Sequence, residues 1–238
     1  RFRFLRSFTA LILREMTTRY GNSPGGYLWA ILEPVAALVL LSFVFSLMLR
    51  SPGLGDNFMY FYAGGVLPFG LYSAVVAAVA AAVRFSRPLL EYPAVSFIDA
   101  IAARFVLNSV TQILVSFIVI GGIIYYYQLS PILRWPSLIL SFSMAMALGL
   151  GLGLVNCFFI TAYPLWDRAW TVVSRPLFIM SGVMFIPEKL PPRVREVLLY
   201  NPLMHVTSEM RKGLFGTYDA VYVDPLYVFE IAVLLILV

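Results

Sequence analysis

The sequence has few charged residues, one cysteine, one histidine and two lysines, and each of these scarcities excludes a class of protein. Charged residues make up 12% of the 238 positions and hydrophobic residues 61%, so the chain has too few charges to cover a water-soluble globule of its size. The one cysteine, Cys157, cannot form an intrachain disulfide. The two lysines, Lys189 and Lys212, follow Glu188 and Arg211, which excludes a phosphate loop ending in Gly-Lys-Ser or Gly-Lys-Thr. We therefore expect a membrane protein that does not hydrolyse ATP through such a loop.

Sequence signals for metal, nucleic-acid and catalytic sites are also missing. His205 has Glu209 one helical turn later but no second histidine or cysteine nearby, so a packed histidine is a better interpretation than a metal ligand. The formal net charge is +5, yet no run of closely spaced Lys and Arg favours nucleic-acid binding. No Asp-x-Asp pair suggests a glycosyltransferase. The prediction is a chain that is not an enzyme and has no catalytic residue, metal or cofactor of its own.

Long apolar runs predict an all-α integral membrane protein. A helix needs about 20 apolar residues to cross a hydrocarbon core of about 30 Å. By this criterion we expect six transmembrane helices, near residues 28–49, 58–83, 105–127, 137–160, 166–186 and 221–238. The segment from Asn57 to Val83 carries no charge at all and gives the strongest signal.

The positions of the arginines predict the orientation of these spans. Arginines collect before the first span, between the second and third, and just after the fourth, and such loops are typically cytoplasmic. The segment from Pro187 to Asp224 has balanced charges, so we place it outside. Six spans then put both termini in the cytoplasm.

The N-terminal segment has the pattern of a helix that lies on the membrane surface. At 100° per residue, apolar side chains share one face of residues 4–20: Leu5, Phe8, Ile12, Met16 and Tyr20. Arg14 lies opposite, and Arg19 can pair with Glu15. Gly21 to Gly26 form a glycine-rich hinge. We divide the chain into a cytoplasmic interfacial helix and hinge, residues 1–26, and a transmembrane domain, residues 27–238. A plain membrane anchor is the alternative for the helix.

The loop between the second and third spans is a candidate contact with a cytoplasmic partner. Pro88 and Pro93 prevent a continuous helix, while residues 95–103 can form a short helix that carries Asp99. Many apolar side chains, with Tyr92 among them, accompany Arg87 and Glu91 in this loop, which favours docking over a simple connector.

Two ionisable residues that lie beyond the first turn of an expected span stand directly before a proline: Glu33 and Arg175. An intramembrane charge costs roughly 2.5 to 3.5 kcal/mol by insertion scales, so such a residue is expected to face a polar lumen or a partner. Arg175 can alternatively bind carbonyls freed by Pro176 or pair with Asp167. Aromatic residues near span ends, such as Trp170 and Phe178, are typical of interfacial belts, or they stack on sugar rings.

Several motifs together carry a family resemblance. They are Arg14-Glu15, Arg19-Tyr20-Gly21, Gly26 to Pro34, Leu67-Pro68-Phe69, Tyr92-Pro93, Phe97 to Arg104, Arg175 to Phe178, Ser181 to Phe185 and Asn201 to Val206. In order and spacing the chain resembles, over nearly its whole length, the polysaccharide-exporting permeases of the type-2 ABC exporter family.

The resemblance implies a homodimer in the bacterial inner membrane, docked to two separate ATPase subunits that bind ATP and Mg. It implies export of a lipid-linked, anionic capsular polysaccharide, with periplasmic adaptor and outer-membrane partners. The surface helix and the loop after the second span would contact the ATPase, through Arg14, Arg19, Arg87, Glu91, Tyr92 and Asp99. The first and fifth spans would line the conduit, with Arg175, Glu33, Trp170 and Phe178 on the substrate path. Outer re-entrant helices would occupy residues 187–215.

Two alternatives stay open at the level of sequence. The cargo can be O-antigen, teichoic acid or a small amphiphilic drug instead of capsular polysaccharide. A membrane-embedded transferase acting on lipid-linked sugars is the alternative from another class, although no catalytic motif supports it.

Overall fold

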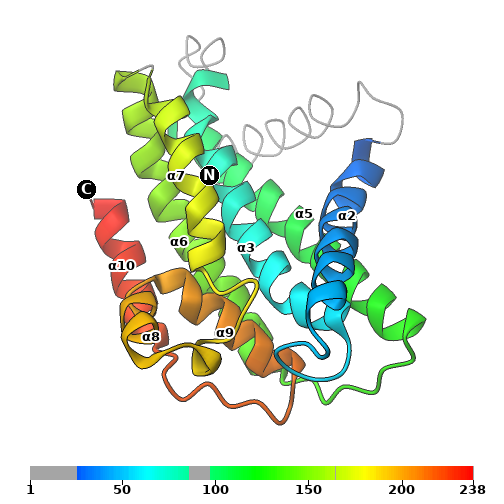
Figure 1. Ribbon diagram of the computed structural model, residues 1–238. Helices are drawn as coiled ribbons and strands as arrows, with labels where there is room; N and C mark the ends of the chain where they lie inside the picture. The colour runs from blue at the N-terminus through cyan, green and yellow to red at the C-terminus, as the bar shows by residue number, and fades with distance from the viewer. Residues whose placement is uncertain (1–25, 86–96, 164, 238) are drawn as a thin grey trace.

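The computed structural model describes residues 26–85, 97–163 and 165–237, and these residues contain helices and no strand. The helices are α2 (Gly26–Met48), α3 (Phe58–Ala80), α5 (Phe97–Tyr126), α6 (Trp135–Ala162), α7 (Trp166–Met180), the 3-10 helix η1 (Pro187–Lys189), α8 (Pro192–Leu199), α9 (Pro202–Leu214) and α10 (Pro225–Leu237). Figure 1 shows the long helices side by side, with α8 and α9 gathered at one end. The all-α prediction is confirmed for the described part of the chain.

Four of the described helices, α2, α3, α5 and α6, are long and apolar enough to cross a membrane. The last helix, α10, is apolar but shorter. These features are those of an integral membrane protein.

Helix α3 forms the centre of the bundle. In its apolar window 72% of the residues are buried, because α2, α5, α6 and α9 all pack against it. The closest approach is to α6, where a Cβ atom on Gly149 would lie 2.9 Å from Val75 and one on Gly153 would lie 2.7 Å from Val79. Small residues four apart on α6 thus permit the close packing of the two helices.

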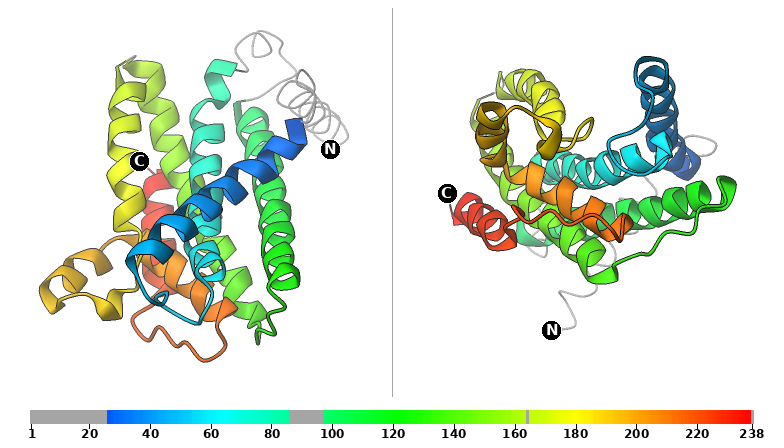
Figure 2. Two further views of the ribbon diagram at one scale, coloured as in Figure 1. Left: turned by 45° about the vertical axis from the view of Figure 1, so that its right-hand side comes forward. Right: turned by 60° about the horizontal axis from the view of Figure 1, so that its bottom comes forward.

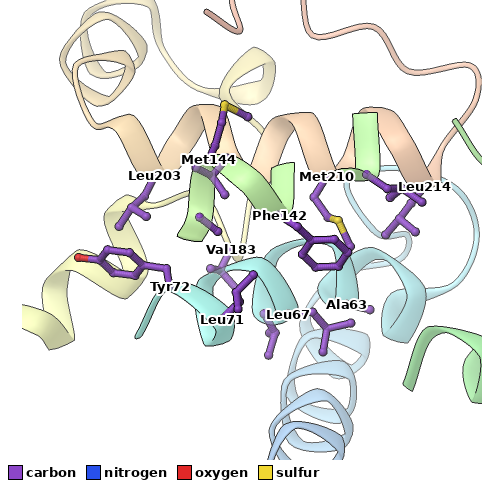
Figure 3. Packing of buried hydrophobic residues seen from close by; sticks show 14 of the residues in the cluster. Ala63, Leu67, Leu71, Tyr72, Phe142, Met144, Val183, Leu203, Met210 and Leu214 are labelled. Carbon is purple, nitrogen blue, oxygen red and sulfur yellow. The ribbon is translucent and has the colours of Figure 1, made fainter. Parts of the chain in front are cut away.

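Helix α9 lies across the ends of α3 and α6 and closes the core there (Figures 2 and 3). It begins where the Asn201 side chain accepts a hydrogen bond from the Leu203 amide, with Pro202 in the first turn. Hydrogen bonds tie it to α3 and α6: Tyr60 Oη donates to the Leu214 carbonyl at 3.0 Å, Ser141 Oγ to the Val206 carbonyl at 2.8 Å, and the Arg134 amide to the Gly213 carbonyl at 2.8 Å. Helix α9 is therefore part of the packed core, whereas α8 buries only Leu198.

The third apolar segment begins earlier than expected. The short helix expected near residues 95–103 is not separate, because the chain is helical without a break from Phe97 into α5. Polar side chains in this stretch are accommodated inside the helix pair: Arg104 donates to the Ala78 carbonyl at 3.2 Å and stacks over the Phe85 ring at 4.2 Å. Asn108 donates to the Arg104 carbonyl.

The helix formed by the fifth apolar segment ends earlier than expected. Helix α7 stops at Met180, before the expected end at residue 186. Gly182 has φ +70°, a left-handed conformation that glycine adopts at little cost and that ends a helix.

Part of the expected architecture lies outside the described residues. This is the case for the interfacial helix at 4–20, for the hinge up to residue 25, and for the loop residues 86–96. The first described residue, Gly26, already belongs to α2.

Candidate functional site

Helix α7 has no buried residue, and it lies along an open side of the bundle (Figure 1). Helix α2 is similar: only 6% of its apolar window is buried. Both helices are predicted from the sequence to line the substrate path, and both leave side chains available for contacts outside this chain.

A cavity of about 320 Å³ lies between α2, α3 and α7. Two of the predicted path residues line it: Glu33 from α2 and Phe178 from α7. Phe178 is held by the Phe69 ring of α3, with ring centroids 5.0 Å apart in an edge-to-face arrangement. The structure therefore brings together two residues that are far apart in the sequence.

A second cavity of about 350 Å³ adjoins the first, since both are lined by Phe69, Ser73 and Ala77 of α3. Trp170, the third predicted path residue, lines this second cavity. We call the two cavities together the α2–α7 groove.

Arg175, the fourth predicted path residue, lines neither cavity. Its neighbours Ser174 and Leu177 do, and Arg175 itself is exposed on α7. Within the described residues its guanidinium makes no hydrogen bond or ion pair, so neither sequence alternative for Arg175 is observed there. Asp167 pairs instead with Arg84, at 3.5 Å.

The chemistry of the α2–α7 groove is that of binding. Its charged groups are the carboxylate of Glu33 at one end and the Arg84–Asp167 ion pair at the other, whose side chains are 66% and 49% exposed. Alanines, hydroxyl groups and aromatic rings supply the rest of the lining. Across residues 26–85, 97–163 and 165–237, no group of three or more His, Cys, Asp or Glu side chains could hold a metal ion.

Of the residues predicted to couple to an ATPase, only Asp99 lies in the described part of the chain. It occupies the first turn of α5 and its exposed fraction is 8%, while the neighbouring Phe97 and Ile98 are 57% and 73% exposed. The apolar surface offered to a partner at this position therefore belongs to Phe97 and Ile98. Arg14, Arg19, Arg87, Glu91 and Tyr92 lie outside the described residues.

Sequence analysis missed Arg211, which is the largest fully buried side chain among the described residues. Its guanidinium donates to the carbonyls of Gly182 at 2.7 Å, Val183 at 2.8 Å and Phe185 at 3.0 Å, and its Cζ lies 4.5 Å from the centre of the Phe61 ring. We call this arrangement the Arg211 clamp. It fixes the loop that follows α7 onto α9. The only sequence signal was a second cation directly before Lys212 at the end of α9.

A chain of hydroxyl groups surrounds the clamp. Tyr218 donates to a Glu188 carboxylate oxygen at 2.8 Å, its Oη lies 3.0 Å from that of Tyr222, and Tyr222 donates to Ser208 at 2.8 Å. Burial raises the pKa of Tyr218 and Tyr222, so both phenols keep their protons. Burial lowers the pKa of Arg211 to about 10, which leaves the group cationic at neutral pH.

His205 has a structural role, as the sequence predicts. Its Nε2 lies 2.9 Å from the Leu199 carbonyl, and its Nδ1 accepts a hydrogen bond from the Asp224 amide at 3.0 Å. Both ring nitrogens are engaged by the backbone, so the ring joins α9 to the start of α10.

Comparison with known proteins places the chain in a family. A family model described as ABC-2 type transporter matches residues 6–215. The polysialic acid transport protein KpsM of Escherichia coli is 30% identical over 233 residues, which are 95% of this chain and 89% of that protein. The capsule polysaccharide export inner-membrane protein CtrC of Neisseria meningitidis serogroup B is 26% identical over 227 residues, 94% and 84% of the two chains. The corresponding protein BexB of Haemophilus influenzae is 26% identical over 231 residues, 91% and 83% of the two chains. The resemblance inferred from sequence motifs is confirmed, and the chain belongs to the ABC-2 type transporter family.

Proposed function

We propose that this chain is the transmembrane permease subunit of an ATP-driven exporter that moves a lipid-linked, anionic capsular polysaccharide across the bacterial inner membrane. Three relatives support the cargo, since their names refer to polysialic acid transport or to capsule polysaccharide export. The observation that carries the proposal is the α2–α7 groove, which lies between two helices that have almost no buried residues. A soluble or self-contained protein would cover such surfaces within its own fold.

In this proposal the chain crosses the membrane six times, with α7 and α10 as the fifth and sixth spans. Helix α7 rises about 22 Å over its 15 residues, and the loop fixed by the Arg211 clamp continues from it toward the membrane surface. Helices η1, α8 and α9 then form the outer re-entrant segment, and both termini are cytoplasmic. The arginines at the Trp166 end of α7, Arg84 and Arg168, support that orientation.

The functional unit in this proposal is a homodimer, with the conduit between the two subunits. The exposed faces of α2 and α7 would meet their counterparts across the dimer axis. Each subunit would bind one separate ATPase, which holds ATP and Mg. Arg14, Arg19, Arg87, Glu91 and Tyr92 would contact it, and Asp99 would fix the start of α5 beside this contact. A periplasmic adaptor and an outer-membrane protein would continue the path.

Polymer movement in this proposal depends on four side chains. Arg175 would attract phosphate or carboxylate groups of the substrate, because it is exposed on α7 and has no partner in the described part of its own chain. Trp170 and Phe178 would stack on sugar rings along the groove. Glu33 would repel anionic groups from the groove wall and so keep the polymer near the dimer axis.

The test is the substitution Arg175→Gln in the exporter assembled with its ATPase. We expect loss of polysaccharide export and of substrate-stimulated ATP hydrolysis, with basal hydrolysis retained, because only the contact with the anionic substrate is removed. Arg193→Gln, on the exposed first turns of α8, is the matched control and is expected to behave as wild type. Unchanged export by a folded Arg175→Gln protein would refute this role of Arg175.

A further inference from the structure

A third cavity, of about 790 Å³, lies on the other side of α2, between α2, the start of α3 and the end of α5. It shares no lining residue with the α2–α7 groove. Its volume is within the range of sites that hold small organic ligands. We call it the α2–α5 cavity.

Along its length, the α2–α5 cavity is lined mostly by apolar side chains. Its lining on α2 runs from Ile31 to Ser46, a rise of about 22 Å. Over most of that length the wall consists of aliphatic and aromatic side chains, together with the bare backbone of Gly122 on α5. A trough of this length and polarity, in a helix bundle that crosses the membrane, fits an extended hydrocarbon chain.

Polar groups gather at one end of the α2–α5 cavity, where α2 and α5 end and α3 begins. Asp56 lies there and is exposed, and within residues 26–85, 97–163 and 165–237 its carboxylate has no ion pair. Asn57 accepts the Tyr60 amide hydrogen with its Oδ1 at 3.0 Å, which leaves the amide nitrogen of the same side chain as a donor. Tyr126 and Tyr127, each of which carries a hydroxyl group, also line the cavity at the end of α5.

The charges at the mouth discriminate between lipid headgroups. Among residues 26–85, 97–163 and 165–237, no lysine or arginine lines the α2–α5 cavity, and Asp56 is the one charged residue that does. A headgroup with net negative charge would meet a carboxylate and no cation, whereas anionic lipids are normally held by basic side chains. A headgroup with an ammonium group satisfies Asp56, while Asn57 and the tyrosine hydroxyls are the donors that its phosphate requires.

From this complementarity we propose that the α2–α5 cavity is a binding site for a bilayer phospholipid with an ammonium headgroup, such as phosphatidylethanolamine. One acyl chain lies along α2, and the headgroup lies at Asp56 and Asn57. The occupant differs from the anionic cargo proposed above, and the site is separate from the cargo groove.

Native mass spectrometry of the full-length protein, with added dioleoyl phosphatidylethanolamine or dioleoyl phosphatidylglycerol, tests this proposal. We expect the wild type to retain phosphatidylethanolamine in preference to phosphatidylglycerol. Asp56→Asn should weaken that retention by about two- to fivefold, as expected for loss of one exposed ion pair. Gly122→Leu should remove most of it, because a side chain at Gly122 meets nothing of the protein within 4 Å and would project into open space that the cavity includes.

Matched controls exist for both variants. Gly121 also has open space around it, but it does not line the cavity, so Gly121→Leu is expected to retain the lipid as the wild type does. Glu196→Gln removes an exposed carboxylate from α8, outside the cavity, and should also have no effect. Equal retention of the two lipids by the wild type would overturn the proposal. Equal phosphatidylethanolamine retention by the Gly121→Leu and Gly122→Leu proteins would also overturn it. A dimer in which a second copy of the chain fills the cavity would overturn it as well.

Discussion

At the scale of single residues, the Arg211 clamp is the most demanding feature of the structure. A guanidinium that is fully buried must satisfy its donors with protein atoms, because water cannot reach it. Here three backbone carbonyls accept from Nη1 and Nη2 and the face of Phe61 covers the group, while Nε makes no hydrogen bond within the described residues. The clamp therefore stabilises the loop and α9 together, and removing the cation leaves three carbonyls without a donor.

We predict that Arg211→Met lowers the free energy of unfolding by about 3 kcal/mol or more, since breaking a buried, hydrogen-bonded cation site leaves its partners unsatisfied. The variants are purified in detergent and heated, and size-exclusion chromatography then measures the fraction of protein that stays monodisperse at each temperature. Arg193→Met, at an exposed position of α8, is the control and should melt as the wild type does. Equal melting of both variants would contradict a stabilising role for the clamp.

One of the three carbonyls of the clamp belongs to Gly182. A side chain at this position is unfavourable for two reasons. Its φ of +70° costs an L residue about 1–2 kcal/mol, and a Cβ atom there would clash with the sulfur of Met204. We predict that Gly182→Ala is destabilising by at least the backbone cost, measured by the same thermal assay.

Gly121→Ala provides the comparison for that experiment, because Gly121 lies inside α5 with open space around it. Alanine favours a helix interior over glycine by up to about 1 kcal/mol, so this variant should be neutral or more stable. If both alanine variants melted alike, neither the backbone conformation nor the Met204 contact would matter.

At the scale of elements, the α3–α6 contact depends on the absence of side chains at two positions of α6. Gly149 and Gly153 bring the backbone of α6 against Val75 and Val79. Without a hydrophobic driving force between helices in a bilayer, such close packing is a main source of helix association.

We predict that Gly153→Leu separates α3 from α6 and costs about 1–3 kcal/mol or more, as overpacking of a tight contact does. The readout is the fraction of monodisperse protein that remains after heating. Gly121→Leu is again the control, since it adds the same side chain to open space. Wild-type stability of Gly153→Leu would mean that the two helices do not pack as described.

The helices were predicted from the sequence better than their ends were. Apolar runs revealed α2, α3, α5, α6, α7 and α10, because length and hydropathy are local properties. The start of α5 was placed too late because Arg104 resembles a loop residue, and its partners, the Ala78 carbonyl and the Phe85 ring, are distant in sequence. The end of α7 was placed too late because hydropathy continues through Val183 to Ile186, while the left-handed Gly182 stops the helix.

At the scale of the whole molecule, α2 and α7 leave exposed faces that the proposed dimer would cover. Nearly all of α2 and all of α7 lack the burial that α3 has. Neighbouring lipid can cover the apolar part of these surfaces but not Arg175, which requires a polar surrounding.

We predict that a cysteine on the Arg175 face of α7 forms a disulfide between two subunits. Val172, one helical turn before Arg175, is 70% exposed, so Val172→Cys in a Cys157→Ser background should give a covalent dimer on mild oxidation in membranes. Leu234→Cys, on a 63% exposed position of α10, should not. A monomeric Val172→Cys protein under these conditions would argue against a dimer axis beside α7.

Three of the four residues predicted to lie on the substrate path line the α2–α7 groove, whereas Arg175 does not, and their arrangement was not predicted. The sequence indicated Glu33, Trp170 and Phe178 individually, because a charge in a span and aromatics near span ends are visible locally. It could not indicate that Phe69 of α3 lines both cavities of the groove, or that Asp167 pairs with Arg84. Such pairings depend on which helices become neighbours, and no local pattern encodes that. The Arg211 clamp was missed for the same reason.

Helix α7 is held by side-chain contacts at both ends, and this has a mechanical consequence. At one end Trp166 donates to Asn156 at 2.8 Å and stacks on Phe159, and at the other end the chain enters the loop that Arg211 holds. Between these fixed ends lies Pro176, which has no amide hydrogen to complete the helix. A helix that is held at both ends bends most readily at its proline, so a widening of the passage beside α7 would be greatest next to the guanidinium of Arg175.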